Sequence, residues 1–339
     1  MMSSFVPGLQ LSRDFYTEVV RPLVAGVPHS AALIGAGSEV LAFDTERSAD
    51  HGWGPRVVLF TAAGVAQEVG EAVGRGLPEV FGGYPTVFGG GSGVVVADPG
   101  EWFAGRLGFD PVRGVGVLDW LSAPWQRLAE VTSGEVFHDG LGVLEPARAA
   151  LRWYPADLWR YVLAVQWRRL AQEESFPGRC GEVGDDLGSA VVTAGLAREV
   201  MRLALLMRRR YPPYSKWLGS GFARLSGAAE LGEALSRAVA AREWRERERH
   251  LGRAYERVAA LYNRVGLAGP LEAPVRGLPG RPFQVIGAGR FADALAAAVT
   301  DPVVAALPPA GSVDQFAGSA DVLTCPERCR AVTRAVLGL

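Results

Sequence analysis

The stretch IGAGSEVLAFDTERSADHGWGPRVVLF, residues 34–60, decides how the rest of the chain is interpreted. It opens with an apolar run that ends in glycine, which is typical of a buried strand followed by a turn. At this turn Gly37 allows the backbone to approach a ligand closely, and Ser38 with free amides can bind phosphate oxygens. Asp50 follows, and we expect it to begin the next strand. The pattern predicts half of a nucleotide site.

The first 150 residues are typical of an α/β (α+β) domain, because short apolar runs alternate with one amphipathic segment. We expect a helix within 1–26, strands at 31–35, 56–60 and 94–98, and a crossover helix at 64–77. The glycine-rich stretch 82–93 predicts a loop or hairpin. Residues 114–121 predict a strand that turns into a helix at Asp119, a residue type common at helix N-caps.

Helical spacing of apolar residues replaces this pattern after residue 150 and predicts a helical bundle over 151–265. The expected helices are 156–174, 189–210, 228–242 and 243–264. Residues 266–280 are rich in proline and glycine and begin a C-terminal extension, 266–339, that packs back on the body. The extension holds the run FQVI, a helix at 290–300 and a last helix from about 326.

Composition limits the classes of function. The chain has 339 residues, 49% apolar residues and a net charge of −1, so we expect a soluble protein that does not bind nucleic acid nonspecifically. No apolar run is long enough for a membrane span, and no secretory pattern opens the chain, so we expect a cytoplasmic location. Three cysteines predict neither disulfides nor zinc. Lys216 is the only lysine beside 34 arginines, which indicates a place for a compact ammonium or chance.

The glycine–serine turn and the carboxylate on the following strand resemble the DNA polymerase β-like nucleotidyltransferases. Nearly the whole chain resembles an uncharacterised bacterial family of unknown function that is assigned to this superfamily, which includes the kanamycin-type and minimal nucleotidyltransferases. The resemblance lies in segments 37–56, 119–124, 135–142, 166–189, 212–219 and 311–316. It implies a nucleotidyltransferase-like N-terminal domain with a mixed sheet, followed by an α-helical bundle domain.

The resemblance also implies roles for individual residues. Gly37 and Ser38 would hold the phosphates of ATP or another NTP, and Asp50 with a partner two residues later would bind Mg²⁺. Asp119 is the candidate for a third acid that binds metal or acts as base. A helix N-cap is the alternative reading of Asp119.

One residue departs from the superfamily pattern. Position 52 is glycine where a second metal-binding aspartate is expected, and this loss weakens a magnesium site that needs oxygen ligands. His51 would point to the opposite face of the expected strand. Asp44 and Glu46 on the connecting loop are replacement carboxylates or solvated loop charges.

In the helical part, the resemblance implies a base and nucleotide-binding cations. Glu173 and Glu174 are candidates for the base, and Arg179 for a clamp on phosphate or carboxylate. The alternative for these three is an ion pair at a helix end. The nucleotide-contacting group would be Tyr214, Ser215 and Lys216, where a tyrosine stacks on a base and a lysine meets a phosphate.

Two further motifs have structural alternatives. His138 and Asp139 form an acid–base couple or a turn stabilised by aspartate. The segment 286–294, IGAGRFADA, imitates a dinucleotide-binding fingerprint, but no second strand with a ribose-binding acid follows, so we interpret it as a strand–helix turn.

Three functions remain open from the sequence. The first is transfer of a nucleoside monophosphate from an NTP to a hydroxyl or amine of a small molecule. The second is a catalytically degenerate protein that binds a nucleotide or another ligand. The third is a repurposed cleft with metal-independent chemistry in specialised metabolism.

Overall fold

The computed structural model describes residues 5–50 and 52–339, with the backbone but not the side chain of Asp50. The chain divides into two compact units. Unit 1 contains Met1–Arg152 and Asp321–Ala331, and unit 2 contains Trp153–Ala320 and Val332–Leu339. The first division falls two residues beyond the expected end of the N-terminal domain. The expected C-terminal extension, 266–339, divides between the two units.

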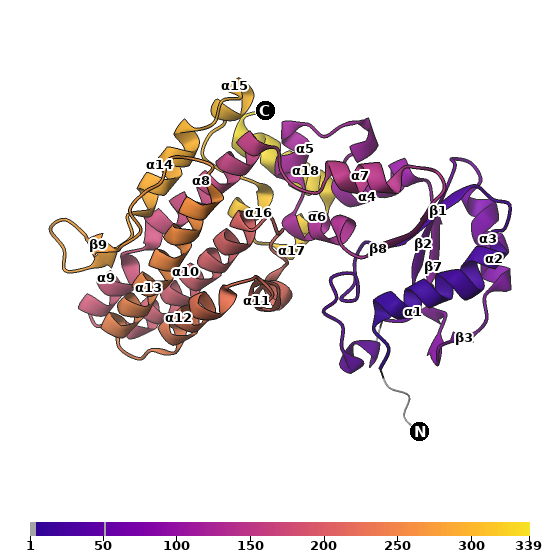
Figure 1. The fold of residues 1–339 in the computed structure, drawn as a ribbon, viewed down its shortest axis with the longest axis horizontal. Helices are drawn as coiled ribbons and strands as arrows, with labels where there is room; N and C mark the ends of the chain where they lie inside the picture. Colours follow the sequence, from indigo (N-terminus) through magenta and orange to yellow (C-terminus); the bar gives the residue numbers. More distant parts are fainter. Residues whose placement is uncertain (1–4, 51) are drawn as a thin grey trace. The chain divides into compact units, whose positions relative to one another are not determined.

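A four-stranded mixed sheet is the centre of unit 1, with strand order β7-β2-β1-β8 (Figure 1). Strand β1 is antiparallel to both of its neighbours, and β2 is parallel to β7. The strands are β1 His29–Leu33, β2 Val57–Thr61, β7 Val94–Ala97 and β8 Glu135–Asp139. Every residue of β1 and β2 is buried, as expected for central strands covered on both faces.

Helices cover the two faces of this sheet. On one face Val57 and Leu59 pack with Phe15 and Val73 from the helices α1 and α3. On the other face the ring of Phe60 contacts Trp102 and Phe103 of α4. The helical elements of unit 1 are α1 Gly8–Phe15, the π-helix Tyr16–Val20, α2 Arg21–Leu23, the 3-10 helix Glu46–Asp50, α3 Ala66–Gly76, α4 Pro99–Leu107, the 3-10 helix Pro111–Arg113, α5 Val117–Ser122, α6 Trp125–Thr132 and α7 Leu144–Ala150.

Several expectations for unit 1 need correction. Residues 114–118 form no strand, and the segment enters α5 directly because Asp119 caps its first turn. The sequence missed β8, whose polar residues do not show apolar alternation. Of the two expectations for the glycine-rich stretch, a loop or a hairpin, the structure has the hairpin, and it has two of them. They are β3 Val80–Phe81 with β4 Tyr84–Pro85 and β5 Val87–Phe88 with β6 Gly91–Ser92.

Unit 2 is helical, and its long helices lie alongside one another (Figure 1). Helix α8 packs against α10 and α14, and α10 packs against α13. The ring of Trp167 on α8 stacks on Phe291 of α14 with 4.3 Å between centroids, and Tyr262 of α13 meets both rings edge-on. Burial of one large side chain of this kind contributes about 2–3 kcal/mol to folding.

The elements of unit 2 are α8 Ala156–Glu173, α9 Phe176–Glu182, α10 Asp186–Met207, α11 Ser215–Ala223, α12 Ala228–Ala240, α13 Trp244–Val265, β9 Arg276–Gly277, β10 Gln284–Val285, α14 Ala288–Ala297, α15 Pro302–Ala305 and α16 Val313–Phe316. The long helices of unit 2 lie close to the expected ranges, whereas the short helices α9, α11, α15 and α16 were not predicted. Two elements cross the division between the units, α17 Ala320–Leu323 and α18 Pro326–Leu337. In the described part of the chain, no helix combines the length and the apolar content needed to cross a bilayer.

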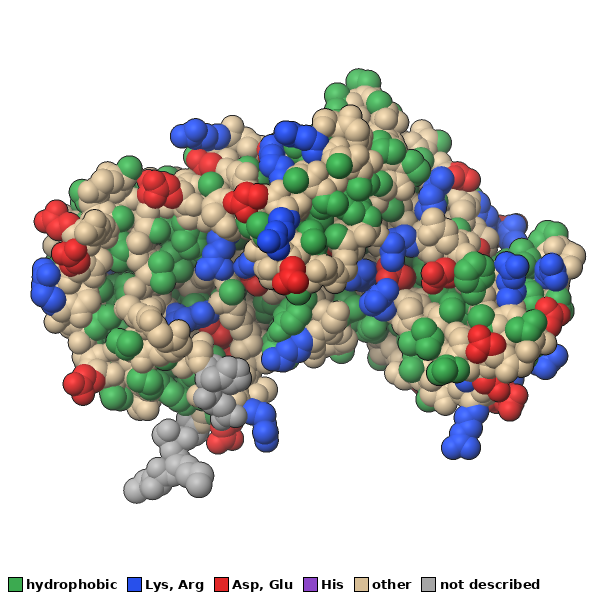
Figure 2. Space-filling model, turned by 180° about the vertical axis from the view of Figure 1, so that it is seen from behind, with side chains coloured by type: hydrophobic (Ala, Val, Ile, Leu, Met, Phe, Trp, Pro, Cys, Tyr) green, Lys and Arg blue, Asp and Glu red, His purple; other side chains and the backbone are tan. Residues whose placement is uncertain are grey.

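Surface charge agrees with the near-zero net charge. On the face drawn in Figure 2, basic and acidic side chains are interspersed with apolar ones over the described residues.

Candidate functional site

The segment after β1 turns sharply at residues 35–38, which we call the bend. The amide of Gly35 donates to the carbonyl of Glu130, and the carbonyl of Ser38 accepts from the amide of Phe43. These two bonds fix both ends of the bend. Between them, the amides of residues 36–38 and the Ser38 hydroxyl have no hydrogen-bond partner among the described residues. Successive backbone amides without partners are a common site for anions.

Gly37 is required here for a reason that the sequence did not reveal. Its φ is +149°, and a Cβ atom would collide with the Arg56 guanidinium and the Glu39 carboxylate. Arg56 donates through Nη2 to the carbonyl of Ala36 and pairs with Glu39. A side chain at position 37 would therefore displace two charged groups of the protein itself. The implied contact of Gly37 with a phosphate stays a prediction.

Glu39 and Arg56 form a buried ion pair beside the bend. The Oε1 atom of Glu39 faces the guanidinium at ion-pair distance but without hydrogen-bond geometry. Burial raises the pKa of Glu39, and the charge of Arg56 opposes that rise. The Nε atom of Arg56 is also a buried donor without a hydrogen-bond partner. The bend thus has unused donor capacity on a charged side chain.

Arg106 is the residue at this site that sequence reasoning missed. It lies on α4, half-buried over the ring of Trp102 at 5.2 Å from the centroid. A Cβ atom on Gly35 would lie 3.5 Å from its Cζ atom, so the guanidinium is next to the bend. The guanidinium of Arg106 has no hydrogen bond or ion pair with any described residue. Nothing in the local sequence marks it, because only the fold brings α4 to the end of β1.

We call Arg56, Arg106 and Arg127 the arginine cluster. Burial lowers the pKa of Arg106, and the neighbouring charge of Arg127 lowers it further. Arg127 pairs with Glu130 at 3.0 Å, and Arg56 pairs with Glu39. Among the described side chains, three guanidinium groups thus face two carboxylates, which leaves one positive charge beside the bend. An arginine remains protonated in such a place, and an anionic ligand would neutralise it.

Asp50 does not begin the next strand. It is the last residue of the 3-10 helix Glu46–Asp50, and β2 begins only at Val57. The expected strand placement was wrong, because apolar residues suited to a strand first appear after Pro55. His51 lies outside the described residues, so its expected orientation stays a prediction. Gly52 is exposed, has φ +62°, and has open space where a side chain would lie.

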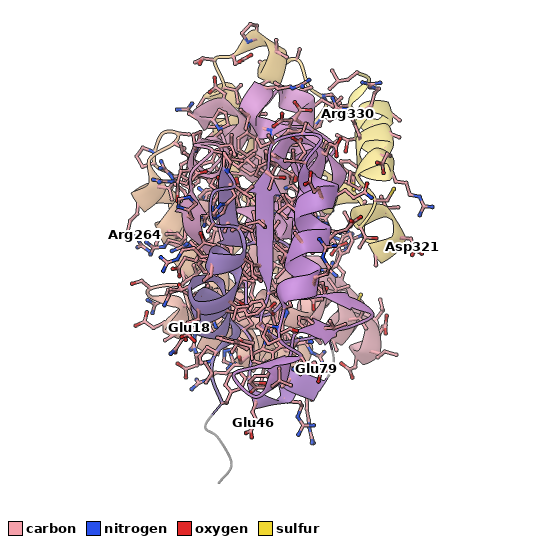
Figure 3. All side chains as sticks on the ribbon, turned by 90° about the vertical axis from the view of Figure 1, so that its right-hand side faces the viewer. Glu18, Glu46, Glu79, Arg264, Asp321 and Arg330 are labelled. Carbon is pink, nitrogen blue, oxygen red and sulfur yellow. The ribbon has the colours of Figure 1, made fainter. Side chains whose placement is uncertain are left out.

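The two loop carboxylates considered as replacements have different surroundings. Asp44 accepts the backbone N–H of Gly8 at 2.7 Å and so binds the first residue of α1. Glu46 is exposed and lies at the edge of unit 1, away from the sheet (Figure 3). Asp44 therefore has a structural partner, and Glu46 is a solvated charge.

Asp119 occupies a helix N-terminus instead of a strand. Its Oδ2 atom accepts the amide of Gly116 at 2.9 Å, and its Oδ1 atom pairs with Arg330. Both oxygens of the candidate third acid are therefore bound within unit 1. No hydrogen bond or ion pair joins Asp119 to the bend among the described residues.

Glu174 binds three backbone amides at the start of α14. Its carboxylate accepts from Ile286, Gly287 and Ala288 at 2.9, 3.1 and 3.0 Å. Burial raises the pKa of Glu174, and these hydrogen bonds oppose that rise. The same amides belong to the segment that imitates a dinucleotide fingerprint. That segment is a strand–helix turn between β10 and α14, as expected, and the protein's own carboxylate fills its anion site.

The other candidates of unit 2 lie at exposed positions. Glu173 ends α8, and Arg179 lies over the ring of Phe176 at 5.5 Å. Neither forms an ion pair with a described residue, so the alternative of a pair at the helix end is not found for them. Tyr214 and Ser215 start α11, and Lys216 lies over Trp217 at 4.8 Å. The implied contact of Tyr214, Ser215 and Lys216 with a nucleotide stays a prediction.

Asp139 stabilises a turn, which confirms the simpler reading of the His138–Asp139 pair. Its carboxylate accepts from the hydroxyl of Ser30 and from the amides of residues 143–145. The hydrogen bonds lower the pKa of Asp139 despite partial burial, which alone would raise it.

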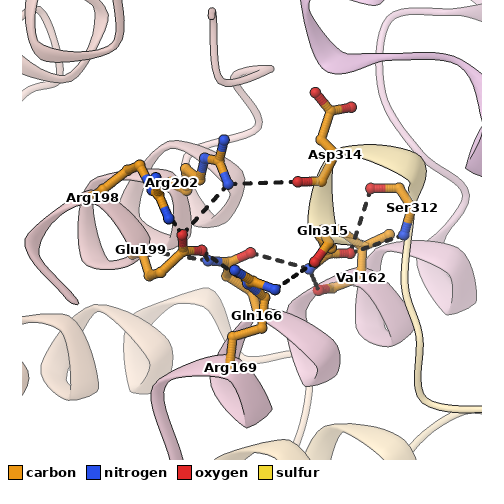
Figure 4. Close-up of polar contacts among 9 residues, drawn as sticks. All are labelled: Val162, Gln166, Arg169, Arg198, Glu199, Arg202, Ser312, Asp314 and Gln315. Carbon is orange, nitrogen blue, oxygen red and sulfur yellow. Dashed lines mark hydrogen bonds and ion pairs between the residues drawn. The ribbon is translucent and has the colours of Figure 1, made fainter. Parts of the chain in front are cut away.

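A buried polar network in unit 2, which sequence reasoning did not foresee, surrounds Glu199 (Figure 4). The carboxylate accepts from Gln166 at 2.8 Å and pairs with Arg169, Arg198 and Arg202. Burial alone would raise the pKa of Glu199, but the arginine charges outweigh it and the pKa is lowered.

The network holds a separate segment of the chain. Gln315 of α16 donates to the carbonyl of Val162 at 3.0 Å and to the side chain of Gln166 at 3.1 Å. Arg169 donates to the carbonyl of Gln315. Segments 166–189 and 311–316, both part of the resemblance, therefore meet at a structural network that joins α8, α10 and α16.

Comparisons with known proteins reach only the middle of the chain. The model of a family described as "Domain of unknown function (DUF4037)" matches residues 120–218. This match supports the resemblance to an uncharacterised family over these residues, which include Glu173 to Lys216 but not the bend. No curated protein and no solved structure matches the chain.

Proposed function

We propose that unit 1 is a nucleotidyltransferase-like unit that binds the phosphates of ATP or another NTP at the bend. The observation that carries the proposal is the unpartnered guanidinium of Arg106 beside a bend whose amides are also unpartnered. Phosphate oxygens accept from both kinds of donor. One hydrogen bond between a guanidinium and a phosphate contributes about 1.5–3 kcal/mol.

Electrostatics support a phosphate ligand over a neutral one. The arginine cluster has one more positive charge than the carboxylates that pair with it. Burial makes this surplus charge costly until an anion neutralises it. Arginine also matches phosphate geometry with two parallel hydrogen bonds.

The described side chains do not form the magnesium set that the superfamily uses. Gly52 has no side-chain oxygen, Asp119 is bound to Gly116 and Arg330, and Asp44 is bound to Gly8. No three His, Cys, Asp or Glu side chains among those described lie together as a metal site. The proposal therefore includes nucleotide binding and no step through a metal.

Transfer of a nucleoside monophosphate to a small-molecule hydroxyl or amine is the second candidate. The resemblance over residues 37–56 favours it, because that segment keeps the glycine–serine turn and one carboxylate at Asp50. In this candidate Asp50 would hold magnesium, and the acceptor would bind beside the triphosphate.

Thermal unfolding with each NTP, with and without magnesium, tests the first candidate. We expect an NTP to raise the Tm of the full chain, since a ligand of the folded state stabilises it by mass action. Arg106→Gln should lose most of this rise. Arg75→Gln, an exposed arginine on α3, is the matched control and should keep it. An unchanged Tm with every NTP, or an equal response of Arg106→Gln and wild type, would overturn the proposal.

A further inference from the structure

A cavity of about 520 Å³ lies at the end of β1 opposite the bend. Residues from the π-helix, α2, the loop before β1 and the end of β8 line it, including Tyr16, Arg21, Val27, His29 and His138. Its volume is in the range of small-molecule sites, which measure about 300–1,000 Å³. Its walls are mainly apolar, with Pro22, Val24 and Pro28 among them.

His29 has a fixed role in the wall of this cavity. Its Nδ1 atom bonds to the carbonyl of Val27 at 2.8 Å, so that nitrogen is the donor. Its Nε2 atom then accepts from the hydroxyl of Tyr16 at 3.0 Å. Both ring nitrogens are used, and burial lowers the pKa of His29, so the ring is neutral. His29 and Tyr16 therefore shape the cavity but offer a ligand no charge.

Arg21 and His138 are the groups that remain for a ligand. Both side chains are exposed, and neither side chain has a hydrogen bond or ion pair with a described residue. The ring of His138 rests against the ring of His29 with 4.8 Å between centroids, which keeps it at the cavity. Two donors therefore border one hollow from different elements, α2 and β8.

The lining contains no carboxylate that could neutralise these donors. Asp139 is next to His138 in sequence, but its oxygens are bound to Ser30 and to the amides of residues 143–145. Unpaired donors over an apolar wall match a ligand with one anionic end and an apolar body.

We propose that this cavity binds a small organic acid, whose carboxylate meets Arg21 and His138 and whose apolar body lies on the wall formed by Pro22, Val27 and Pro28. A carboxylate suits two donors at the edge of the cavity, and a bare inorganic ion would leave the apolar wall uncovered. This site is independent of the nucleotide proposal, because it uses none of the same residues.

Titration calorimetry of the full chain with a panel of monocarboxylates, from acetate to octanoate and benzoate, tests the site. We expect at least one acid with an apolar body to bind with a Kd below about 1 mM. We expect two control ligands to bind more than about tenfold more weakly. Benzamide, the neutral counterpart of benzoate, lacks the anionic carboxylate, and inorganic phosphate lacks the apolar body.

Variants link the binding to this cavity. Arg21→Gln and His138→Gln should each weaken the best acid by about tenfold or more, and Arg75→Gln should not. Both side chains are exposed, so the variants should keep the wild-type Tm. The ring resonances of His138, one of four histidines, should shift on addition of the acid. No binding by the whole panel, or equal binding by both variants and wild type, would overturn the proposal.

Discussion

The guanidinium of Arg56 lies where a side chain on Gly37 would have to be. The two residues are nineteen positions apart, and the chain returns to the bend just before β2 begins. The arginine at position 56 can therefore keep its place only because position 37 is glycine. This arrangement places a partly buried positive charge against a turn with unpartnered amides.

Gly37→Ala should destabilise unit 1 by about 1–3 kcal/mol, because a Cβ atom would displace Arg56 or Glu39 and strain the backbone. Urea unfolding followed by circular dichroism measures the change. Gly105→Ala is the control, since that glycine lies in α4 with open space around it and an ordinary helical φ. Equal stability of Gly37→Ala and wild type would contradict the crowding at residue 37.

Glu174→Ala should destabilise unit 2 by about 2–3 kcal/mol, because three amides at the start of α14 lose their acceptor. Glu173→Ala changes the neighbouring exposed carboxylate and should change stability by less than about 0.5 kcal/mol. Chemical denaturation of both variants gives the comparison. Equal stability of Glu174→Ala and Glu173→Ala would contradict this structural role of Glu174. It would leave Glu174 available as a catalytic base.

Glu199 should make stability depend on acid pH. Its pKa in the folded protein is lowered from the ordinary 4.5, so its contribution is fully present above that value. The contribution is lost as pH falls through the lower folded pKa, where the carboxylate becomes protonated among three arginines.

Glu199→Gln should cost about 1–3 kcal/mol at pH 7, because three partly exposed arginines lose the carboxylate that they share. It should also remove part of the fall in stability between neutral and acid pH. Unfolding curves from pH 7 to pH 3 would show this. A variant with the same acid dependence as wild type would exclude Glu199 as its source.

Gly52→Asp tests whether the missing carboxylate limits magnesium binding. The position is exposed with open space, and aspartate tolerates its positive φ better than most residues. We expect magnesium to increase the Tm rise from NTP in this variant more than in wild type. Release of pyrophosphate would then report transfer. Loss of a wild-type activity in Gly52→Asp would instead support metal-independent chemistry.

Much of the helical part of the fold was predictable, because the spacing of apolar residues along a segment indicates a helix without knowledge of its tertiary contacts. The helices α8, α12 and α13 begin and end within about two residues of the expected positions, since each has one continuous apolar face. β8 was missed because EVFHD has little apolar character and is held by pairing with β1. Tertiary pairing of that kind leaves no mark in a single sequence.

The candidate site was only partly predictable for a similar reason. Gly37 and Ser38 carry a recognisable motif, but Asp50 was expected at the start of a strand whose apolar residues begin only at Val57. Arg106 and Arg127 come to the bend from helices far along the chain. Their role depends on which helices cover one face of the sheet. That packing cannot be predicted from the local pattern of a single sequence.

The C-terminal segment returns to unit 1 at Asp321 and leaves it again after Ala331, which includes the partner of Asp119, Arg330. During synthesis, the N-terminal part therefore emerges long before the piece that completes it. A protein truncated after Arg152 would lack that piece, and a single protease cut could not release unit 1 whole. Unit 1, with its bend, is therefore complete only after the residues up to Ala331 have left the ribosome.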